Sequence, residues 1–249
     1  MILAADIGGS HIDLGLVRGK RVFSPFHIPL APGSTQKQVL AAIVAGMQRF
    51  RGYHKIAAAA PGPFRAAGVV GNTPNLPLRN FPLARFLRRR FRKQVVVEND
   101  AKCFALGEAV YGAGKRHRIV LGITLGTGIG GGLVIRKRLY RGRGNAGEIG
   151  HMLISRSRDL ESLYQGLKRR DGSIRDFRVL GRYLGAAVVN AAHLYDPDVI
   201  IFGGRVSRLH FRRFLPEMRS FAARHLLVSP PLLLPSRLRH AALVGAGLL

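Results

Sequence analysis

The N-terminal part of the chain alternates between apolar and polar positions in a way that is typical of short β-strands joined by tight turns. Between the strands lie stretches in which apolar residues recur every three or four positions, the spacing of an amphipathic helix. The predicted strands are Ile2–Ala5, Ile12–Val17, Arg21–His27, Ile56–Ala60 and Val95–Glu98, and the predicted helices are Thr35–Phe50 and Asp100–Tyr111. This pattern predicts an α/β unit that opens with a three-stranded meander.

The same succession of strand, glycine turn, strand, strand and helix starts again at Ile119. Its predicted strands are Ile119–Leu125, Gly132–Ile135, Leu139–Arg141 and Val199–Phe202, and its predicted helices are Asp176–Tyr195, Leu209–His225 and His240–Leu249. A repeat of this kind predicts two duplicated lobes around a central cleft. We place the N-terminal lobe at residues 1–112 and the C-terminal lobe at residues 113–249, with the last helix packing back on the N-terminal lobe.

Length and composition agree with a folded, soluble protein. The chain has 249 residues, of which 47% are hydrophobic, enough to build buried cores. Its apolar runs are strand-sized and shorter than the roughly 18 residues of a membrane span, and its N-terminus lacks the basic start and cleavage site of a signal peptide. Cys103 is the single cysteine, so no internal disulfide can form. We therefore expect a cytoplasmic protein that does not associate with membranes.

The charge changes this picture. The 40 Lys and Arg residues outnumber the 13 Asp and Glu residues, which gives a formal net charge of +27. Such a surface attracts polyanions. Because the basic clusters are spread along the chain, a solvated basic surface and a specific site for polyphosphate or nucleic acid both remain open.

The segment DIGGS, from Asp6 to Ser10, places a carboxylate at a strand end before two glycines. Without side chains, the amides of Gly8 and Gly9 can approach a phosphate closely, and Asp6 would orient a magnesium ion. A glycine pair after a strand is also ordinary hairpin chemistry.

A second glycine-rich stretch, GITLGTGIGGG from Gly122 to Gly132, contains the GxGxxG spacing at Gly126, Gly128 and Gly131. A dinucleotide-binding fingerprint should open a helix, whereas this run leads into a hairpin. We therefore interpret it as a second phosphate turn. The hydroxyl of Thr127 and the amides of Gly126 and Gly128 are the predicted donors.

Three further segments carry acidic or imidazole groups. In VENDA, Asp100 follows a predicted strand and lies at the start of a predicted helix. Either Asn99 or Asp100 could be its N-cap, or Asp100 could accept a proton in phosphoryl transfer. In GNAGEIGHM, Glu148 and His151 suit polyol hydroxyls or a weak metal pair, although no cysteine or second histidine lies near to complete a zinc site. Glu161 opens a predicted helix, where the dipole favours an acidic residue in any case.

Taken together and in this order, these motifs resemble the ROK family of sugar kinases and repressors, over nearly the whole chain. The segments that carry the likeness are DIGGSHIDLGLV, APGPF, NTPNLP, VENDAKCFALGEAVYGAG, GITLGTGIGGGLVI, RGRGNAGEIGHM and DPDVIIFGGRVS. The resemblance implies the actin-like ATPase fold, which is related to ribonuclease H. It also implies a glucokinase-like enzyme that uses ATP and Mg²⁺ to phosphorylate a hexose.

Carried over position by position, the resemblance implies that Asp100 is the general base. The implied sugar ligands are Asn75, Asn99, Asp100, Glu148, His151 and Glu161. The residues implied around the donor are Asp6, Gly8, Gly9, Ser10, Gly126, Thr127, Gly128, Gly203 and Gly204, with Asp6 as the magnesium ligand and the last two glycines beside the adenosine.

Two departures from the family pattern matter. Many members carry a three-cysteine zinc loop after the GEIGH histidine, a loop that helps to fix this histidine. Here only Met152–Arg158 separates His151 from Asp159, with no cysteine, so we predict no zinc site. The first predicted strand begins at Ile2, which leaves no room for the DNA-binding domain of the repressors.

The sequence therefore predicts an ATP-dependent hexokinase that binds no specific DNA. It leaves open whether the protein forms a homodimer. A polyphosphate-dependent glucokinase is the first alternative, favoured by the charge of +27 and by the short zinc-less segment. The second alternative is a non-catalytic protein of the same fold that binds nucleic acid or another polyanion.

Overall fold

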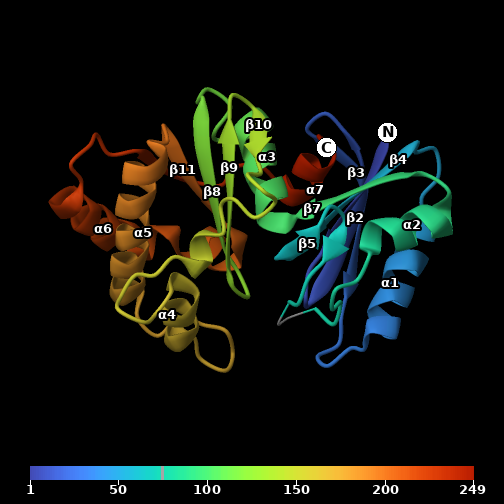
Figure 1. Cartoon of the computed structure of the whole chain (residues 1–249), viewed down its shortest axis with the longest axis horizontal. Helices are drawn as coiled ribbons and strands as arrows, with labels where there is room; N and C mark the ends of the chain where they lie inside the picture. The colour runs from blue at the N-terminus through green and yellow to red at the C-terminus, as the bar shows by residue number, and fades with distance from the viewer. Residues whose placement is uncertain (74–75) are drawn as a thin grey trace. The chain divides into compact units, whose positions relative to one another are not determined.

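The computed structural model describes residues 1–73 and 76–249, which form two compact units (Figure 1). The first unit contains residues 1–107, 141–146 and 238–249, and the second contains residues 108–140 and 147–237. Each unit has its own five-stranded mixed sheet and its own core. The functional lobe boundary at residue 112 and the central cleft stay predictions.

The sheet of the first unit is a meander extended by parallel strands. Its strands are β1 (Ile2–Ile7), β2 (His11–Arg18), β3 (Arg21–Pro29), β4 (Lys55–Ala60) and β7 (Gln94–Asn99), in the order β3-β2-β1-β4-β7. The remaining elements are the small hairpin β5 (Phe64–Ala66) and β6 (Val69–Val70) and the helices α1 (Gln36–Gln48), α2 (Leu83–Phe91) and α7 (Ala241–Ala246). The helix α3 (Asp100–Tyr111) begins in this unit and passes into the second after Gly107. β1 pairs antiparallel with β2 and parallel with β4.

Both faces of this sheet are covered, because successive side chains of a strand point to opposite sides. One set of alternate residues of β1 and β4 packs in the core shared with α1 and α2. The other set consists mostly of alanines and packs against Cys103 and α7. Small residues are required here, since a Cβ on Gly245 would lie 1.7 Å from the carbonyl oxygen of Cys103. The last helix thus packs directly on β1 and β4.

The second sheet repeats the order of the first. Its strands are β8 (Ile119–Leu125), β9 (Ile129–Ile135), β10 (Arg138–Tyr140), β11 (Val199–Gly203) and β12 (Leu232–Pro235), in the order β10-β9-β8-β11-β12. The helical elements are the 3₁₀ helix η1 (Ile149–His151), α4 (Leu160–Leu167), α5 (Phe177–Tyr195) and α6 (Gly204–His225). Antiparallel pairing from β8 to β10 and parallel pairing from β8 to β12 match the first sheet, which confirms the predicted duplication.

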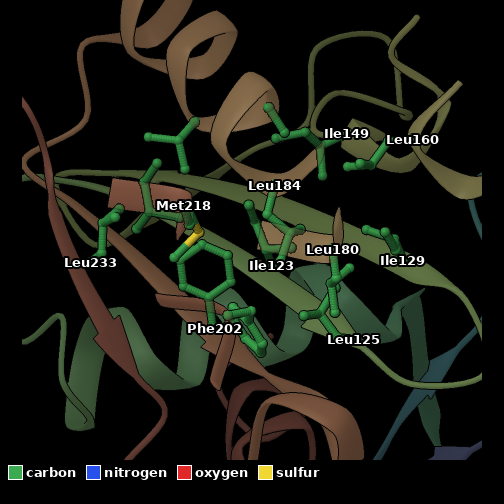
Figure 2. Close-up of a cluster of buried hydrophobic side chains, with 14 of the residues drawn as sticks. Ile123, Leu125, Ile129, Ile149, Leu160, Leu180, Leu184, Phe202, Met218 and Leu233 are labelled. Atoms are coloured by element: carbon green, nitrogen blue, oxygen red, sulfur yellow. The ribbon is translucent and has the colours of Figure 1, made fainter. Parts of the chain in front are cut away.

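The core of the second unit lies between β8, β11, α4, α5 and α6 (Figure 2). Ile123, Phe202, Leu184 and Met218 come from four of these elements and meet in this cluster. α5 and α6 approach closely because α5 carries glycine at the contact: a Cβ on Gly181 would lie 2.7 Å from a carbonyl oxygen of α6.

Several predicted bounds were wrong, each for a local reason. α6 begins at Gly204 rather than at Leu209, because Gly203 caps it directly at the end of β11. The glycines at 130–132 belong to β9, so the turn between β8 and β9 is only three residues long. α2 was missed because its arginines obscure an apolar face that buries Leu83 and Leu87. Over residues 1–73 and 76–249, none of the helices has the length and hydrophobicity that a bilayer crossing requires.

Candidate functional site

The first predicted phosphate turn, from Gly8 to Ser10, connects β1 to β2. The Gly8 amide donates to the carbonyl of His11 over 2.9 Å, and a Cβ on Gly8 would lie 3.3 Å from that oxygen. Glycine therefore keeps the start of the turn close to β2. Asp6 precedes the turn and pairs across the strands with Asp13.

Burial raises the pKa of two carboxyl groups of the first unit, those of Asp6 and Asp100. Removal from water, followed by the negative charges of Asp100 and Asp13, raises the pKa of Asp6 to about 8. Burial also raises the pKa of Asp100. The amide of Ala101 donates to Oδ1 of Asp100 over 2.7 Å, which partly offsets this rise in the pKa. A carboxylate with a raised pKa is suited to accept a proton near neutral pH.

This acidic pair also fits a magnesium ion. Carboxylate oxygens are the protein ligands that Mg²⁺ prefers, and one or two of them suffice when phosphates supply further oxygens. A divalent cation would favour the charged form of Asp6, against the burial and the neighbouring negative charges that raise its pKa. Within the described ranges, 1–73 and 76–249, no cluster of three or more His, Cys, Asp or Glu side chains is arranged to hold a metal. The absence of zinc remains a prediction.

Asn99 ends β7 and caps α3. Its side-chain oxygen accepts a hydrogen bond from the Lys102 amide over 3.0 Å, and the residue is only 4% exposed. The capping role that the sequence left open between Asn99 and Asp100 thus belongs to Asn99. Asp100 is the first helical residue, where the positive end of the helix dipole favours its negative charge.

Sequence reasoning missed the groups that hold residues 141–146 on the first unit. Glu98 Oε2 accepts from Nε of Arg141 over 2.7 Å, and Nζ of the buried Lys102 donates to the carbonyl of Gly144. The side chain of Asn145 exchanges two hydrogen bonds of 3.2 Å with the backbone of Phe64. Charged residues inside the apolar run VVVENDAKCFAL were the signal that could have revealed them.

The second predicted phosphate turn, Gly126 to Gly128, lies in the second unit and joins β8 to β9. Leu125 and Ile129 pair at its base, and the Gly126 amide donates to the Gly128 carbonyl over 2.9 Å. The Gly126 amide is therefore used inside the turn, contrary to the donor role we predicted for it. The amides that follow, those of Thr127 and Gly128, become the candidate phosphate donors.

Glu161 lies against this turn. Its Oε2 accepts from the Ile129 amide over 2.6 Å, and its Oε1 accepts from Nε2 of Gln165 over 2.6 Å. A Cβ on Gly128 would lie 2.8 Å from Oε1, so only glycine lets the carboxylate approach the turn. The role of Glu161 as a sugar ligand stays a prediction.

Glu148 directly precedes η1, and His151 is the last residue of η1. Glycine lets this segment lie against β9, because a Cβ on Gly131 would lie 2.3 Å from the carbonyl oxygen of Gly147. A Cβ on Gly150 would be equally close, 2.4 Å, to a carbonyl oxygen of β9. Gly131 and Gly150 therefore allow the close packing of this segment against β9.

His151 is oriented by Asp159. Its Nδ1 lies 3.1 Å from Oδ2 of Asp159, whose Oδ1 accepts from the Ser162 amide over 2.8 Å and so caps α4. Hydrogen bonds with Ser162 and His151 lower the pKa of Asp159, so it stays charged at neutral pH. A carboxylate therefore holds the imidazole in this chain.

Gly203 and Gly204 join β11 to α6. Gly204 has a φ of +80°, and a Cβ on it would lie 2.4 Å from the carbonyl oxygen of Leu125. The start of α6 therefore abuts the end of β8, next to the second turn. No side chain caps α6, so its first amides suit a nucleotide.

The structure thus groups the predicted residues into two sets, one in each unit. The first unit holds Asp6, Gly8, Gly9, Ser10, Asn99 and Asp100, and the second holds Gly126, Thr127, Gly128, Glu148, His151, Glu161, Gly203 and Gly204. Asn75 lies outside the described residues.

Comparison with known proteins gives consistent matches. The model of the ROK family matches residues 2–163. A glucokinase of Streptomyces coelicolor is 30% identical, over 83% of this chain and 82% of its own length. The crystal structure of a ROK family glucokinase from Streptomyces griseus, in complex with glucose and AMPPNP, is 30% identical, covers 98% of this chain and 97% of its own, and superposes with a TM-score of 0.83.

Two further matches bear on the alternatives. An inorganic polyphosphate/ATP-glucomannokinase from an Arthrobacter strain is 28% identical, covers 99% of this chain and 96% of its own, and has a TM-score of 0.77. A xylose repressor of Bacillus spizizenii is 30% identical over 55% of this chain and 44% of its own length.

Proposed function

The chain belongs to the ROK family and has the actin-like ATPase fold of its kinases, and from that premise we propose that it is a sugar kinase. The reaction is transfer of the γ-phosphoryl group of ATP to a hydroxyl of a hexose, with glucose as the first candidate. The likeness to glucokinases that match most of the chain supports this activity.

The observation that carries the proposal is the pair formed by Asp6 and Asp100. Phosphoryl transfer to an alcohol requires a group that takes the hydroxyl proton as the oxygen attacks phosphorus. Asp100 fills this role, because burial raises its pKa and the amide of Ala101 holds one of its oxygens in place. Asp6 is the magnesium ligand, and the ion supplies neutralisation of phosphate charge when it is bound.

The sugar hydroxyls are bound by the polar side chains that the family resemblance assigns to them. Asn99, Glu148 and His151 are the main ones, with Glu161 and the undescribed Asn75 as further ligands. Asp159 fixes the imidazole through Nδ1, so Nε2 is the nitrogen of His151 that meets a hydroxyl.

Donor phosphates are bound by backbone amides at the two turns. The amides of Gly9 and Ser10 form the first, because the amide of Gly8 is used inside its own turn, and the amides of Thr127 and Gly128 form the second. The adenosine lies at the start of α6, beside Gly203 and Gly204. Glycine at these positions leaves room for phosphate oxygens to reach the backbone.

A coupled assay of the purified protein tests the proposal. Glucose, fructose, mannose, allose and N-acetylated amino sugars are each offered with ATP and Mg²⁺, and separately with polyphosphate. Turnover of at least one hexose with ATP is expected. No turnover with any pair of substrates would contradict a kinase.

A second candidate donor is inorganic polyphosphate. The formal charge of +27 and the likeness to the Arthrobacter glucomannokinase favour it. Polyphosphate should then replace ATP in the assay or compete with it at low salt. A rate with ATP that is indifferent to added polyphosphate would eliminate this donor.

The same net charge also fits a non-catalytic role, the binding of nucleic acid. Such binding would weaken steeply with salt, because each phosphate contact releases counterions. The acidic residues argue for catalysis instead, since four of only 13 carboxylates, those of Asp6, Asp100, Glu148 and Glu161, occupy the assigned positions.

A further inference from the structure

One face of α4 holds the back of the turn between β8 and β9. Glu161, Tyr164 and Gln165 share this face, because residues three or four apart are neighbours on a helix. Lys168 follows directly after the last helical residue, with an extended backbone. Asp159 caps the helix at its start through the Ser162 amide. None of the side chains at positions 164, 165 and 168 belongs to the sites assigned above.

These three side chains bind the carbonyl oxygens of the turn. The hydroxyl of Tyr164 donates to the Gly126 carbonyl over 2.9 Å, and Nζ of Lys168 donates to the same oxygen over 2.8 Å. Nε2 of Gln165 donates to the Thr127 carbonyl over 2.7 Å, and Lys168 donates to that oxygen as well. Two successive carbonyls are thus each held by two donors.

Peptide geometry gives this arrangement a direction. The C=O and the N–H of a trans peptide point to opposite sides. With the carbonyls of Gly126 and Thr127 turned toward α4, the amides of Thr127 and Gly128 point away from the helix. Adjacent amides that point the same way form a concave site for an anion.

Packing makes the contact rigid. Tyr164 is fully buried, and Nζ of Lys168 lies 4.6 Å from the centre of its ring. Glu161 adds a contact from the same face through the Ile129 amide. A Cβ on Gly126 would meet no other atom within 4 Å, so the side of the turn at this Cβ position is open.

We propose that Tyr164, Gln165 and Lys168 are positioning residues for the phosphoryl donor, which aim the amides of Thr127 and Gly128 without touching the substrate. The proposal rests on the proposed kinase function, because it assigns the second turn to the donor phosphates.

Three variants test it: Lys168→Met, Tyr164→Phe and Gln165→Leu. Steady-state rates are measured with ATP varied at saturating glucose and with glucose varied at saturating ATP. Loss of charged hydrogen bonds should lower kcat/KM for ATP about 10-fold to 100-fold in Lys168→Met, and loss of neutral ones about 2-fold to 10-fold in the other two. The KM for glucose should stay within about 2-fold of the wild-type value, which also shows that each variant is folded.

Arg170→Met is the matched control. Arg170 is exposed, two residues beyond Lys168, and its substitution removes the same charge from the same loop. Its kcat/KM for ATP should equal that of the wild type.

Three results would overturn the proposal. An effect confined to Lys168→Met would make this lysine a direct phosphate ligand instead. Unchanged ATP kinetics in all three variants would remove any role for the helix face, and an equal loss for glucose would indicate general damage.

Calorimetric titration with ATP and Mg²⁺ separates this proposal from the kinase activity. If the wild type turns over no sugar, the kinase function fails, while the donor turn is still tested by nucleotide affinity. A lower affinity for ATP in Lys168→Met and Tyr164→Phe, with an unchanged affinity for adenosine, supports the positioning role. Unchanged ATP affinity contradicts it.

Discussion

Replacing Asp159 with asparagine separates the two hydrogen bonds of this carboxylate. Asparagine caps helices about as well as aspartate, so its oxygen can keep the Ser162 amide. The group then left facing His151 is an NH₂, which donates a hydrogen bond, so Nδ1 must become an acceptor and Nε2 a donor. The substitution thus reverses the hydrogen-bonding character of the nitrogen that we assign to the sugar, while α4 stays capped.

The size of the effect follows from the exposure of the pair. The side chain of His151 is 65% exposed and that of Asp159 is 26% exposed, so water weakens the interaction. A net hydrogen bond of about 0.5–1.5 kcal/mol corresponds to about a 2-fold to 10-fold loss of kcat/KM for glucose. The free energy of unfolding should change by less than about 0.5 kcal/mol.

The assay varies glucose at saturating ATP, and urea unfolding of the same samples reports stability. Asp159→Ala is the companion variant. Its kcat/KM for glucose should fall, and it should also lose about 1 kcal/mol of unfolding free energy because the helix cap is gone. An Asp159→Asn enzyme with wild-type kcat/KM for glucose would refute the orienting role, as would an equal loss of efficiency for ATP.

Two further predictions concern stability. In metal-free buffer, Asp6→Asn should raise the Tm at pH 8, and this gain should shrink toward pH 4. The carboxyl of Asp6 has a pKa of 3.8 in the unfolded chain and about 8 in the folded protein. Between these pH values the wild-type folded state therefore loses stability progressively as the pH rises. A Tm difference that is independent of pH would speak against the raised pKa. Gly204→Ala should cost about 1–3 kcal/mol of unfolding free energy more than Gly172→Ala in urea titrations, because both glycines have a positive φ but only Gly204 faces a carbonyl oxygen at 2.4 Å. Equal costs would mean that the close approach to Leu125 relaxes freely.

The strands and the duplication of the fold could be predicted because their signals are local. β1 and β8 are apolar runs that end in glycine turns, and the same order of elements follows each. α2 escaped prediction because three arginines in its last turn outweigh Leu83 and Leu87 in the sequence. α6 began earlier than expected, since its first residue, Gly204, reads as part of a turn until the close contact with β8 is known.

The candidate site divides in the same way. Short motifs named Asp6, Asp100 and Thr127, because each lies at the end of a strand or just after it. Contacts between distant residues could not be predicted, such as the one between Glu98 and Arg141, which are 43 positions apart. The hydrogen bonds from Tyr164, Gln165 and Lys168 to the second turn also join distant residues and could not be predicted.

Glycine spacing also fails to show which amides a turn uses for itself. The pattern suggested the amide of Gly126 as a phosphate donor, and the structure commits it to the Gly128 carbonyl. The spacing of Gly126, Gly128 and Gly131 proved to mix three tasks: closing the turn, admitting Glu161, and packing η1 against β9.

The role of Asp100 as the base in a sugar kinase is tested most directly by the turnover of Asp100→Asn. With ATP, Mg²⁺ and glucose, kcat should fall by about 10²-fold to 10⁴-fold, because asparagine cannot take the hydroxyl proton. Glucose binding, followed by calorimetry, should remain close to that of the wild type. A variant that keeps the wild-type kcat would contradict the assignment.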